Sequence, residues 1–248
     1  MHPAAIRDEA LGLIEQGVND CEIARRLGVP RTTVRDWRRP RYEARSPFPT
    51  TACPHCGRRT RGIVPSPAEY AELLGLYLGD GHITETARTE RLRLTLDAAH
   101  PRVVAESEAL LRHVFAGNRV GRFTAHEGRM VVLYVYSSHL SCLFPQHGAG
   151  KKHERHISLE PWQQALVSAA PWELLRGCIR SDGCVFINRT GPYDYLSYEF
   201  SNLSVGILDL FVGTCERLGL RPRRYARRVR LNRCEDVARL VEHVGLKG

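Results

Sequence analysis

Two nine-residue segments of this sequence end in the same Asp-Gly pair and carry its clearest chemical signal. They are residues 73–81, LLGLYLGDG, and residues 175–183, LRGCIRSDG. Both begin with leucine and have small residues at the third and seventh positions, on one face of a helix, where they let another helix approach closely. If the two helices pack together, the carboxylates of Asp80 and Asp182 meet at their C-terminal ends. Two carboxylates beside the negative ends of helix dipoles repel each other, so the pair predicts a divalent cation between them.

The first of these helices is expected to begin at Ser66, because residues 66–69, SPAE, form a capping box with proline at the first helical position. The glycine after each aspartate is expected to end its helix in the left-handed conformation, which glycine adopts without strain. A single segment of this kind is an ordinary helix end. Two copies with similar patterns after them favour a duplicated unit.

The sequence after each segment predicts the same order of elements. In the first copy, leucines alternate with polar residues over 91–97, as in a strand with one buried face, and Pro101 opens an amphipathic helix. Strands at 119–126 and 130–136 and a short helix at 139–144 follow. In the second copy, the helix after Pro171 is followed by strands near Val185 and at 195–200, a helix at 205–218, a strand pair within 221–233 and a helix at 235–244. Each copy therefore predicts an antiparallel sheet covered by helices.

The two segments and the elements after them resemble the LAGLIDADG homing endonucleases. The resemblance covers residues 66–248 and implies a pseudo-symmetric αββαββα duplication, with halves at about 66–147 and 148–248 and the motif helices at their interface. It implies that Asp80 and Asp182 are catalytic and bind the Mg²⁺ that supports DNA cleavage, and that the internal pseudo-two-fold axis makes the protein a monomer. The second segment departs from the family's apolar pattern at Arg176 and Arg180.

The segment between the halves, residues 148–157, contains the adjacent lysines Lys151 and Lys152. They stand out because Lys247 is the only other lysine and all remaining Lys/Arg positions are arginine. The segment resembles the lysine-containing stretch before the second motif of intein-type family members, in which a lysine stabilises charge on the attacking water or the phosphate. Lys151 and Lys152 are therefore both candidate catalytic residues. The alternative is a flexible basic linker that contacts phosphate.

Residues 1–45 form a candidate trihelical DNA-binding domain. Together with the duplicated αββαββα domain that follows, this all-helical domain gives the chain an expected α+β fold class. The stretch 19–37, NDCEIARRLGVPRTTVRDW, follows the helix-turn-helix pattern, with Ala24 where two helices cross, Gly28 at the turn and Val34 packing back. The second helix of such a pair enters the major groove of DNA. Its outward residues are the candidate DNA contacts Arg31, Thr32, Thr33, Arg35 and Arg38. A trihelical protein-binding module is the alternative.

Basic residues also gather on the predicted strands. The net charge is +9 and the isoelectric point about 9.4, which favours a polyanionic partner such as double-stranded DNA. An antiparallel sheet can lie in the major groove, where arginine reads guanine and also neutralises phosphates. The candidate contacts on the sheets are Arg91, Arg93, Arg223, Arg224, Arg228 and Arg230. Arg35 and Arg91 are the expected base readers; for any single arginine, the alternative is a solvated surface charge.

Residues 46–65 are expected to be a linker with a C-x-x-C knuckle at Cys53 and Cys56. Two thiolates at this spacing can share Zn²⁺, but a structural site needs four ligands and the sequence has no second pair nearby. A turn with free thiols is the alternative. The sequence has eight cysteines and no export signal, so the cysteines are expected to be reduced thiols. Those expected in the core are Cys142, Cys178, Cys184, Cys215 and Cys234.

The composition is that of a globular protein, with 43% hydrophobic and 25% charged residues, no apolar run of membrane-spanning length and no signal peptide. The protein is therefore expected in the cytoplasm, associated with the nucleoid and not with a membrane. Two functions stay open. The two aspartates favour sequence-specific DNA binding with Mg²⁺-dependent endonuclease activity. The departures Arg176 and Arg180 and the added helix-turn-helix favour a non-catalytic transcriptional regulator built on the same scaffold.

Overall fold

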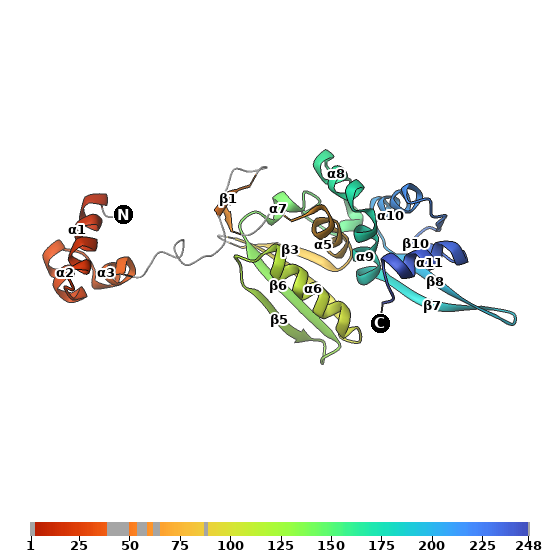
Figure 1. The fold of residues 1–248 in the computed structure, drawn as a ribbon, viewed down its shortest axis with the longest axis horizontal. Coiled ribbons are helices and arrows are strands. Elements are labelled where there is room, and N and C mark those ends of the chain that lie inside the picture. The colour runs from red at the N-terminus through yellow and green to blue at the C-terminus, as the bar shows by residue number, and fades with distance from the viewer. Residues whose placement is uncertain (1–2, 39–49, 54–58, 62–64, 87–88, 248) are drawn as a thin grey trace. The chain divides into compact units, whose positions relative to one another are not determined.

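The computed structural model describes residues 3–38, 50–53, 59–61, 65–86 and 89–247. The chain divides into two compact units, Met1–Pro49 and Thr50–Gly248 (Figure 1). None of the described helices is long and apolar enough to span a membrane.

The first unit is built from the helices α1 (Ala4–Glu15), α2 (Asp20–Leu27) and α3 (Arg31–Arg38). Gly28 ends α2 with a φ of 62°, a left-handed conformation that glycine adopts without strain, and the chain then turns into α3. The buried core of this unit consists of Ala10, Ile23, Val29 and Val34. The trihelical helix-turn-helix predicted from Gly28 and Val34 is therefore confirmed.

The second unit contains two copies of one αββαββα arrangement. The first copy consists of α5 (Pro67–Asp80), β3 (Gly81–Glu85), β4 (Glu90–Asp97), α6 (Pro101–Val114), β5 (Val120–Ala125), β6 (Met130–Ser137) and α7 (Leu140–Leu143). The second copy consists of α9 (Pro171–Asp182), β7 (Gly183–Thr190), β8 (Tyr193–Ser201), α10 (Val205–Arg217), β9 (Arg223–Arg224), β10 (Arg228–Leu231) and α11 (Cys234–His243).

The two four-stranded antiparallel sheets have the orders β3-β4-β6-β5 and β7-β8-β10-β9. Each strand of one copy therefore has a counterpart at the same place in the other, and the α+β class with its duplicated fold is confirmed. Alternation along β4 buries Leu92, Leu94 and Leu96 against the helices and turns Arg91 and Arg93 to the opposite face, as the period of two predicts. The capping box at Ser66 that starts α5 is also confirmed.

Among the described residues of the second unit, four elements outside the two copies were not predicted. In the segment expected to be a linker, β1 (Thr50–Ala52) pairs with β2 (Arg59–Arg61) in a two-stranded antiparallel sheet. Between the copies lie a 3₁₀ helix, η1 (Lys152–Glu154), and the helix α8 (Pro161–Ala169). The buried side chain of Gln163 joins α8 to α5, because its Nε2 donates a 2.6 Å hydrogen bond to the hydroxyl of Tyr70.

The cysteines are divided between the core and the surface. Cys178 and Cys215 are buried, as expected, and Cys142 is half-buried. The prediction was wrong for Cys184 and Cys234, which are exposed. Cys184 points from β7 to the face of the sheet opposite the helices, and Cys234 is the first residue of α11, so neither reaches the core.

Candidate active site

Helix α5 packs against α9 more extensively than any other two elements of the second unit pack together. Glycines allow this approach. A β-carbon on Gly75 would lie 2.6 Å from the carbonyl oxygen of Leu174, and one on Gly177 would collide with the backbone of α5. One turn later, a β-carbon on Gly79 would collide with the side chain of Ser181. The small residues are therefore interface residues, as their spacing predicts, and they bring the two helix ends together.

Gly81 and Gly183 do not end their helices in the left-handed conformation, and that prediction was wrong. Their φ values are −81° and −95°, and each glycine begins the strand after its helix. Glycine is needed for space instead, because a β-carbon on Gly81 would lie 2.5 Å from the Cα of Tyr77. Since each helix runs directly into a strand, Asp80 and Asp182 are the last helical residues.

The carboxylates of Asp80 and Asp182 lie in a partly buried environment at the paired helix ends. Burial and, to a smaller extent, the charge of Asp182 raise the pKa of Asp80 to about 7. Burial also raises the pKa of Asp182, although a hydrogen bond from the side chain of Asn202 opposes the shift. This hydrogen bond joins Nδ2 of Asn202 to Oδ2 of Asp182 over 2.7 Å. Burial therefore disfavours the ionised form of both carboxylates, and the charge of Asp182 adds to this effect on the pKa of Asp80.

Lys152 reaches this site, whereas Lys151 is exposed to solvent. The ammonium of Lys152 donates hydrogen bonds to the main-chain carbonyls of residues 77–79 at the end of α5, with distances of 2.9 Å to the last two. Burial lowers the pKa of Lys152 to about 8, although both aspartates oppose the shift. The sequence did not choose between the two lysines as the one at the aspartate site, whereas the structure places Lys152 there.

Lys247 holds the corresponding place at the end of α9. Its ammonium donates hydrogen bonds to the carbonyls of Ser181, at 2.6 Å, and Gly183, at 2.8 Å. Burial lowers the pKa of Lys247, and both aspartates again oppose the shift. Sequence reasoning missed this residue, which belongs to no motif. The available signal was rarity, because two of the three lysines in the chain stand at these helix ends.

The donor set at the helix ends fits a hard divalent cation. Mg²⁺ is commonly held by one or two carboxylates and completes its coordination with water and phosphate oxygens. Within the described residues no group of three or more histidine, cysteine or acidic side chains is arranged to hold a metal ion, and at this site the negative charge comes from Asp80 and Asp182. A cavity of about 320 Å³ opens beside Asp182 and is lined by Gly79, Lys152 and Asn202, among others. Space for water and a phosphate group is therefore present.

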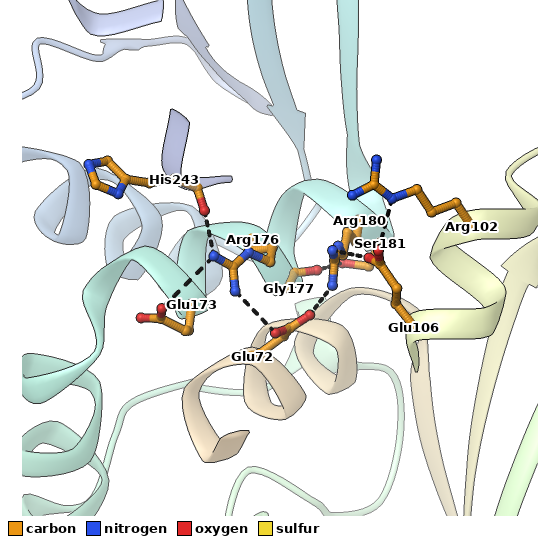
Figure 2. A network of polar contacts seen from close by, with 9 residues as sticks. All are labelled: Glu72, Arg102, Glu106, Glu173, Arg176, Gly177, Arg180, Ser181 and His243. Carbon is orange, nitrogen blue, oxygen red and sulfur yellow. Dashed lines mark hydrogen bonds and ion pairs between the residues drawn. The ribbon is translucent and has the colours of Figure 1, made fainter. Parts of the chain in front are cut away.

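Arg176 and Arg180, which depart from the apolar pattern, form ion pairs between the two copies. Figure 2 shows both guanidiniums directed from α9 toward Glu72 on α5. Arg180 also pairs with Glu106 on α6, and Arg176 donates a hydrogen bond to the carbonyl of His243. The side chains of Arg180 and Glu72 are only 16% and 13% exposed, so water screens their pairing weakly. Arg176 and Arg180 therefore connect the two copies through ion pairs.

Arg91 and Arg93 lie on the face of the first sheet that points away from the core. Arg91 stands opposite Tyr136 on β6, with its guanidinium carbon 5.9 Å from the ring centre, and Arg93 stands opposite Tyr134. The Nε atoms of both arginines have no hydrogen-bond partner among the described residues. Phe123 on β5 adds a ring that is 46% exposed. This face combines two guanidiniums that form no ion pair among the described residues with aromatic rings.

The predicted arginines of the second sheet lie on two different faces. The face away from the helices carries Arg223, Arg228 and Arg230. Arg224 instead stands opposite the buried Val229, and its guanidinium lies 3.6 Å from the carboxylate of Asp209 on α10. Arg224 therefore points toward the helix layer.

Helix α3 exposes four of its five predicted contact residues. Arg31, Thr32, Arg35 and Arg38 are exposed, and Thr33 is half-buried. Arg38 also binds within its own unit, because its Nε lies 2.6 Å from the carboxylate of Asp20 and its Nη2 lies 2.6 Å from the carbonyl of Val18. Arg31 and Arg35 are the more accessible cations of this helix.

The expected zinc knuckle is only partly described. Cys53 follows β1 and is buried, whereas Cys56 lies outside the described residues. Zinc binding by this pair stays a prediction.

Comparison with known proteins relates the two units to two folds. The homeodomain-like domain family matches residues 4–46, and no curated protein matches the chain. Among solved structures, mesophilic variants of the homing endonuclease I-DmoI align with a TM-score of 0.50 and 13% identity, over 72% of this chain and 96% of that one. The homing endonuclease I-WcaI bound to its DNA recognition sequence aligns with a TM-score of 0.49 and 13% identity, over 74% and 84%. The N-terminal LAGLIDADG domain of DUF199/WhiA aligns with a TM-score of 0.47 and 15% identity, over 74% and 84%. The chain therefore joins a homeodomain-like segment to a domain with the duplicated fold of the LAGLIDADG homing endonucleases.

Proposed function

We propose that this protein binds double-stranded DNA in a sequence-specific manner and cleaves it in a Mg²⁺-dependent reaction. The observation that carries the proposal is the meeting of Asp80 and Asp182 at two tightly packed helix ends, with Lys152 and Lys247 beside them. The fold shared with the homing endonuclease I-DmoI and the homeodomain-like match support DNA as the substrate.

Asp80 and Asp182 would hold Mg²⁺ through their carboxylate oxygens, and Asn202 would keep the carboxylate of Asp182 in place. When bound, the ion lowers the pKa of water and stabilises the leaving oxygen of a phosphodiester. Lys152 and Lys247 place positive charge beside the carboxylates, which favours the ionised state that binds metal and attracts the scissile phosphate.

The two sheets and helix α3 would contact the duplex. The outward face of the first sheet offers Arg91 and Arg93 for base edges, while exposed Arg223 on the second sheet suits phosphate. Helix α3 offers Arg31 and Arg35 to a second stretch of major groove.

One observation favours the second candidate function, a non-catalytic transcriptional regulator. Lys152 and Lys247 donate to the carbonyls of Gly79 and Ser181, the residues that precede Asp80 and Asp182. Two ammonium groups and two carboxylates compensate each other, so the site can stay electrically balanced without a metal. A regulator of this kind would bind DNA through the same surfaces and leave it intact.

Selection from a library of randomised duplexes tests the proposal, with parallel arms in Mg²⁺ and Ca²⁺. We expect the retained duplexes to share one sequence in both arms, with products cut at a fixed place in the Mg²⁺ arm. Specific retention without any cut product would favour the regulator. Retention that is independent of sequence would contradict specific DNA binding itself.

A further inference from the structure

Glu199 is an acidic residue in the middle of the basic outward face of the second sheet. It lies on β8 directly opposite Arg230 on β10, and its side chain is 14% exposed. Oε2 of Glu199 accepts two hydrogen bonds from Arg230, from Nε at 3.0 Å and from Nη2 at 2.6 Å. The Nε of Arg228 lies 3.9 Å from the same oxygen.

Arg230 is held on a second side by an aromatic ring. Its guanidinium carbon lies 5.3 Å from the ring centre of Phe186 on β7. The carboxylate and the ring together restrain the guanidinium plane, while the side chain keeps 25% of its surface exposed. Because Nε and one N–H of Nη2 face Glu199, the two donors of Nη1 and the second donor of Nη2 are left for a ligand.

In the described part of the first sheet, Arg91 and Arg93 have no such acidic partner. Arg91 and Arg93 form no ion pair with any carboxylate that the structure describes, and their Nε atoms have no hydrogen-bond partner there. The two sheets share one topology, so the carboxylate is a specific feature of the second sheet and not a consequence of the fold.

We propose that Glu199 determines sequence specificity by positioning Arg230 as a base-reading residue and by preventing it from binding phosphates without regard to sequence. This inference rests on the proposed DNA binding and names the residues that make it selective on the second sheet. A restrained guanidinium loses less side-chain entropy when it meets a guanine edge, and its pairing with a carboxylate weakens attraction to phosphate.

The position of the group supports a role next to the aspartate site. A cavity of about 290 Å³ is lined by Glu199 and Arg228 and shares Asn202 with the cavity beside Asp182. Asn202 is the residue that donates to the carboxylate of Asp182. DNA that enters the aspartate site would therefore lie beside Glu199 and Arg228, which line the adjoining cavity.

The test compares Glu199→Gln with the wild type on a selected duplex and on a random-sequence duplex. Gln keeps the shape but removes the charge, so Arg230 is released to a phosphate. We expect affinity for the random duplex to rise about five-fold, and the slope of log K against log salt to steepen by about one. Preference for one base pair of the selected site should fall about five-fold or more.

Three further variants make the test specific. Glu216→Gln removes the same charge from the exposed surface of α10 and should change none of these quantities. In an Arg230→Ala background, Glu199→Gln should no longer alter base preference, because Glu199 acts through Arg230. Glu199→Asp keeps the charge but shortens the side chain, so random-duplex affinity should stay low while base preference falls. Urea unfolding of every variant reports its folding.

The outcomes separate this inference from the function on which it rests. If the wild type binds no duplex with sequence preference, the proposed function fails and this inference fails with it. If the wild type binds specifically but Glu199→Gln behaves like Glu216→Gln, the role of Glu199 is overturned and the proposed function stands.

Discussion

At the ends of α5 and α9, two carboxylates and two ammonium groups share one partly buried site. Lysine suits this place because its compact ammonium offers three donors, which Lys152 directs to consecutive carbonyls of α5. Apart from Lys152 and Lys247 at the helix ends, the chain has only one further lysine, Lys151, and all its other Lys/Arg positions are arginine. The choice of lysine therefore follows from the geometry of a helix end.

The two adjacent lysines offer a matched test of this account. Lys152→Met leaves the carbonyls at the end of α5 without their donor, so we expect a loss of about 1–3 kcal/mol in the free energy of unfolding. Lys151 is exposed and has only a surface ion pair with Glu154, so Lys151→Met should change that quantity by less than about 0.5 kcal/mol. Urea unfolding measures both, and equal losses in the two variants would contradict the placement of Lys152.

The raised pKa of Asp80 predicts a pH dependence of stability in metal-free protein. Between the ordinary aspartate value of 3.8 and about 7, the folded state binds more protons at Asp80 than the unfolded state does. The free energy of unfolding contributed by this group should therefore fall as pH rises through this window, and level off above it. Asp80→Asn cannot titrate and should lose this part of the slope.

The measurement is the free energy of unfolding at pH 5, 6, 7 and 8 in EDTA, taken as the difference between wild type and Asp80→Asn. Added Mg²⁺ should stabilise the wild type more at pH 8 than at pH 6, because protons compete with the metal for the carboxylate. A difference that does not vary with pH would contradict the burial of Asp80.

At the scale of elements, the ion pairs of α9 explain why arginines replace apolar residues in the second motif. Removing one member of the Arg180–Glu72 pair leaves a poorly hydrated charge, so Glu72→Gln and Arg180→Leu should each cost about 3 kcal/mol of unfolding free energy. The double variant Glu72→Leu/Arg180→Leu removes both charges, so its loss should be smaller than the sum of the two single losses, although Arg176 and Glu106 each lose one partner. Arg112→Ala, which breaks the pair of a 64% exposed arginine with Glu108 outside this network, serves as the control and should cost less than about 1 kcal/mol. Additive losses in the double variant, measured by urea unfolding, would show that the pair is not the source of the stability.

Much of the architecture could be predicted from sequence, because local patterns report local requirements. The alternation that buries Leu92 and Leu94 predicted β4, and glycine spacing predicted the approach of α5 to α9. The role of Gly81 was mistaken because a small residue satisfies either a left-handed φ or a close contact, and sequence alone does not distinguish the two.

Features that depend on distant parts of the chain could not be predicted in this way. Lys247 reaches the end of α9 only because the segment after α11 returns to it. The pairing of Arg180 with Glu72 likewise depends on how two separate helices meet, although the complementary charges are visible once the helices are aligned. The side of the sheet occupied by Arg224 was set by the strand register, which places it opposite Val229.

At the scale of the whole molecule, two compact units with separate cores lie on one chain. Tethering two DNA-binding units raises the effective concentration of the second contact, so deletion of residues 1–49 should lower affinity for a long selected site by about 10²-fold or more. The remaining fragment should unfold cooperatively and protect a shorter footprint. Arg31→Ala/Arg35→Ala in the full chain is the matched control and should mimic the loss of affinity. An unchanged affinity and footprint after the deletion would show that the first unit does not touch the site.

The central claim is that Asp80 and Asp182 form one metal-dependent cleavage site, and it is tested most directly on the selected duplex. The measurement is the rate of strand cleavage in Mg²⁺ together with binding affinity in Ca²⁺, for the wild type, Asp80→Asn and Asp182→Asn. Each substitution keeps the shape of the side chain and removes a charged metal ligand, so we expect cleavage to fall at least about 10²-fold while affinity changes less than about three-fold. Cleavage at the wild-type rate in either variant would contradict the account, because the residue replaced could not then be a ligand on which the reaction depends.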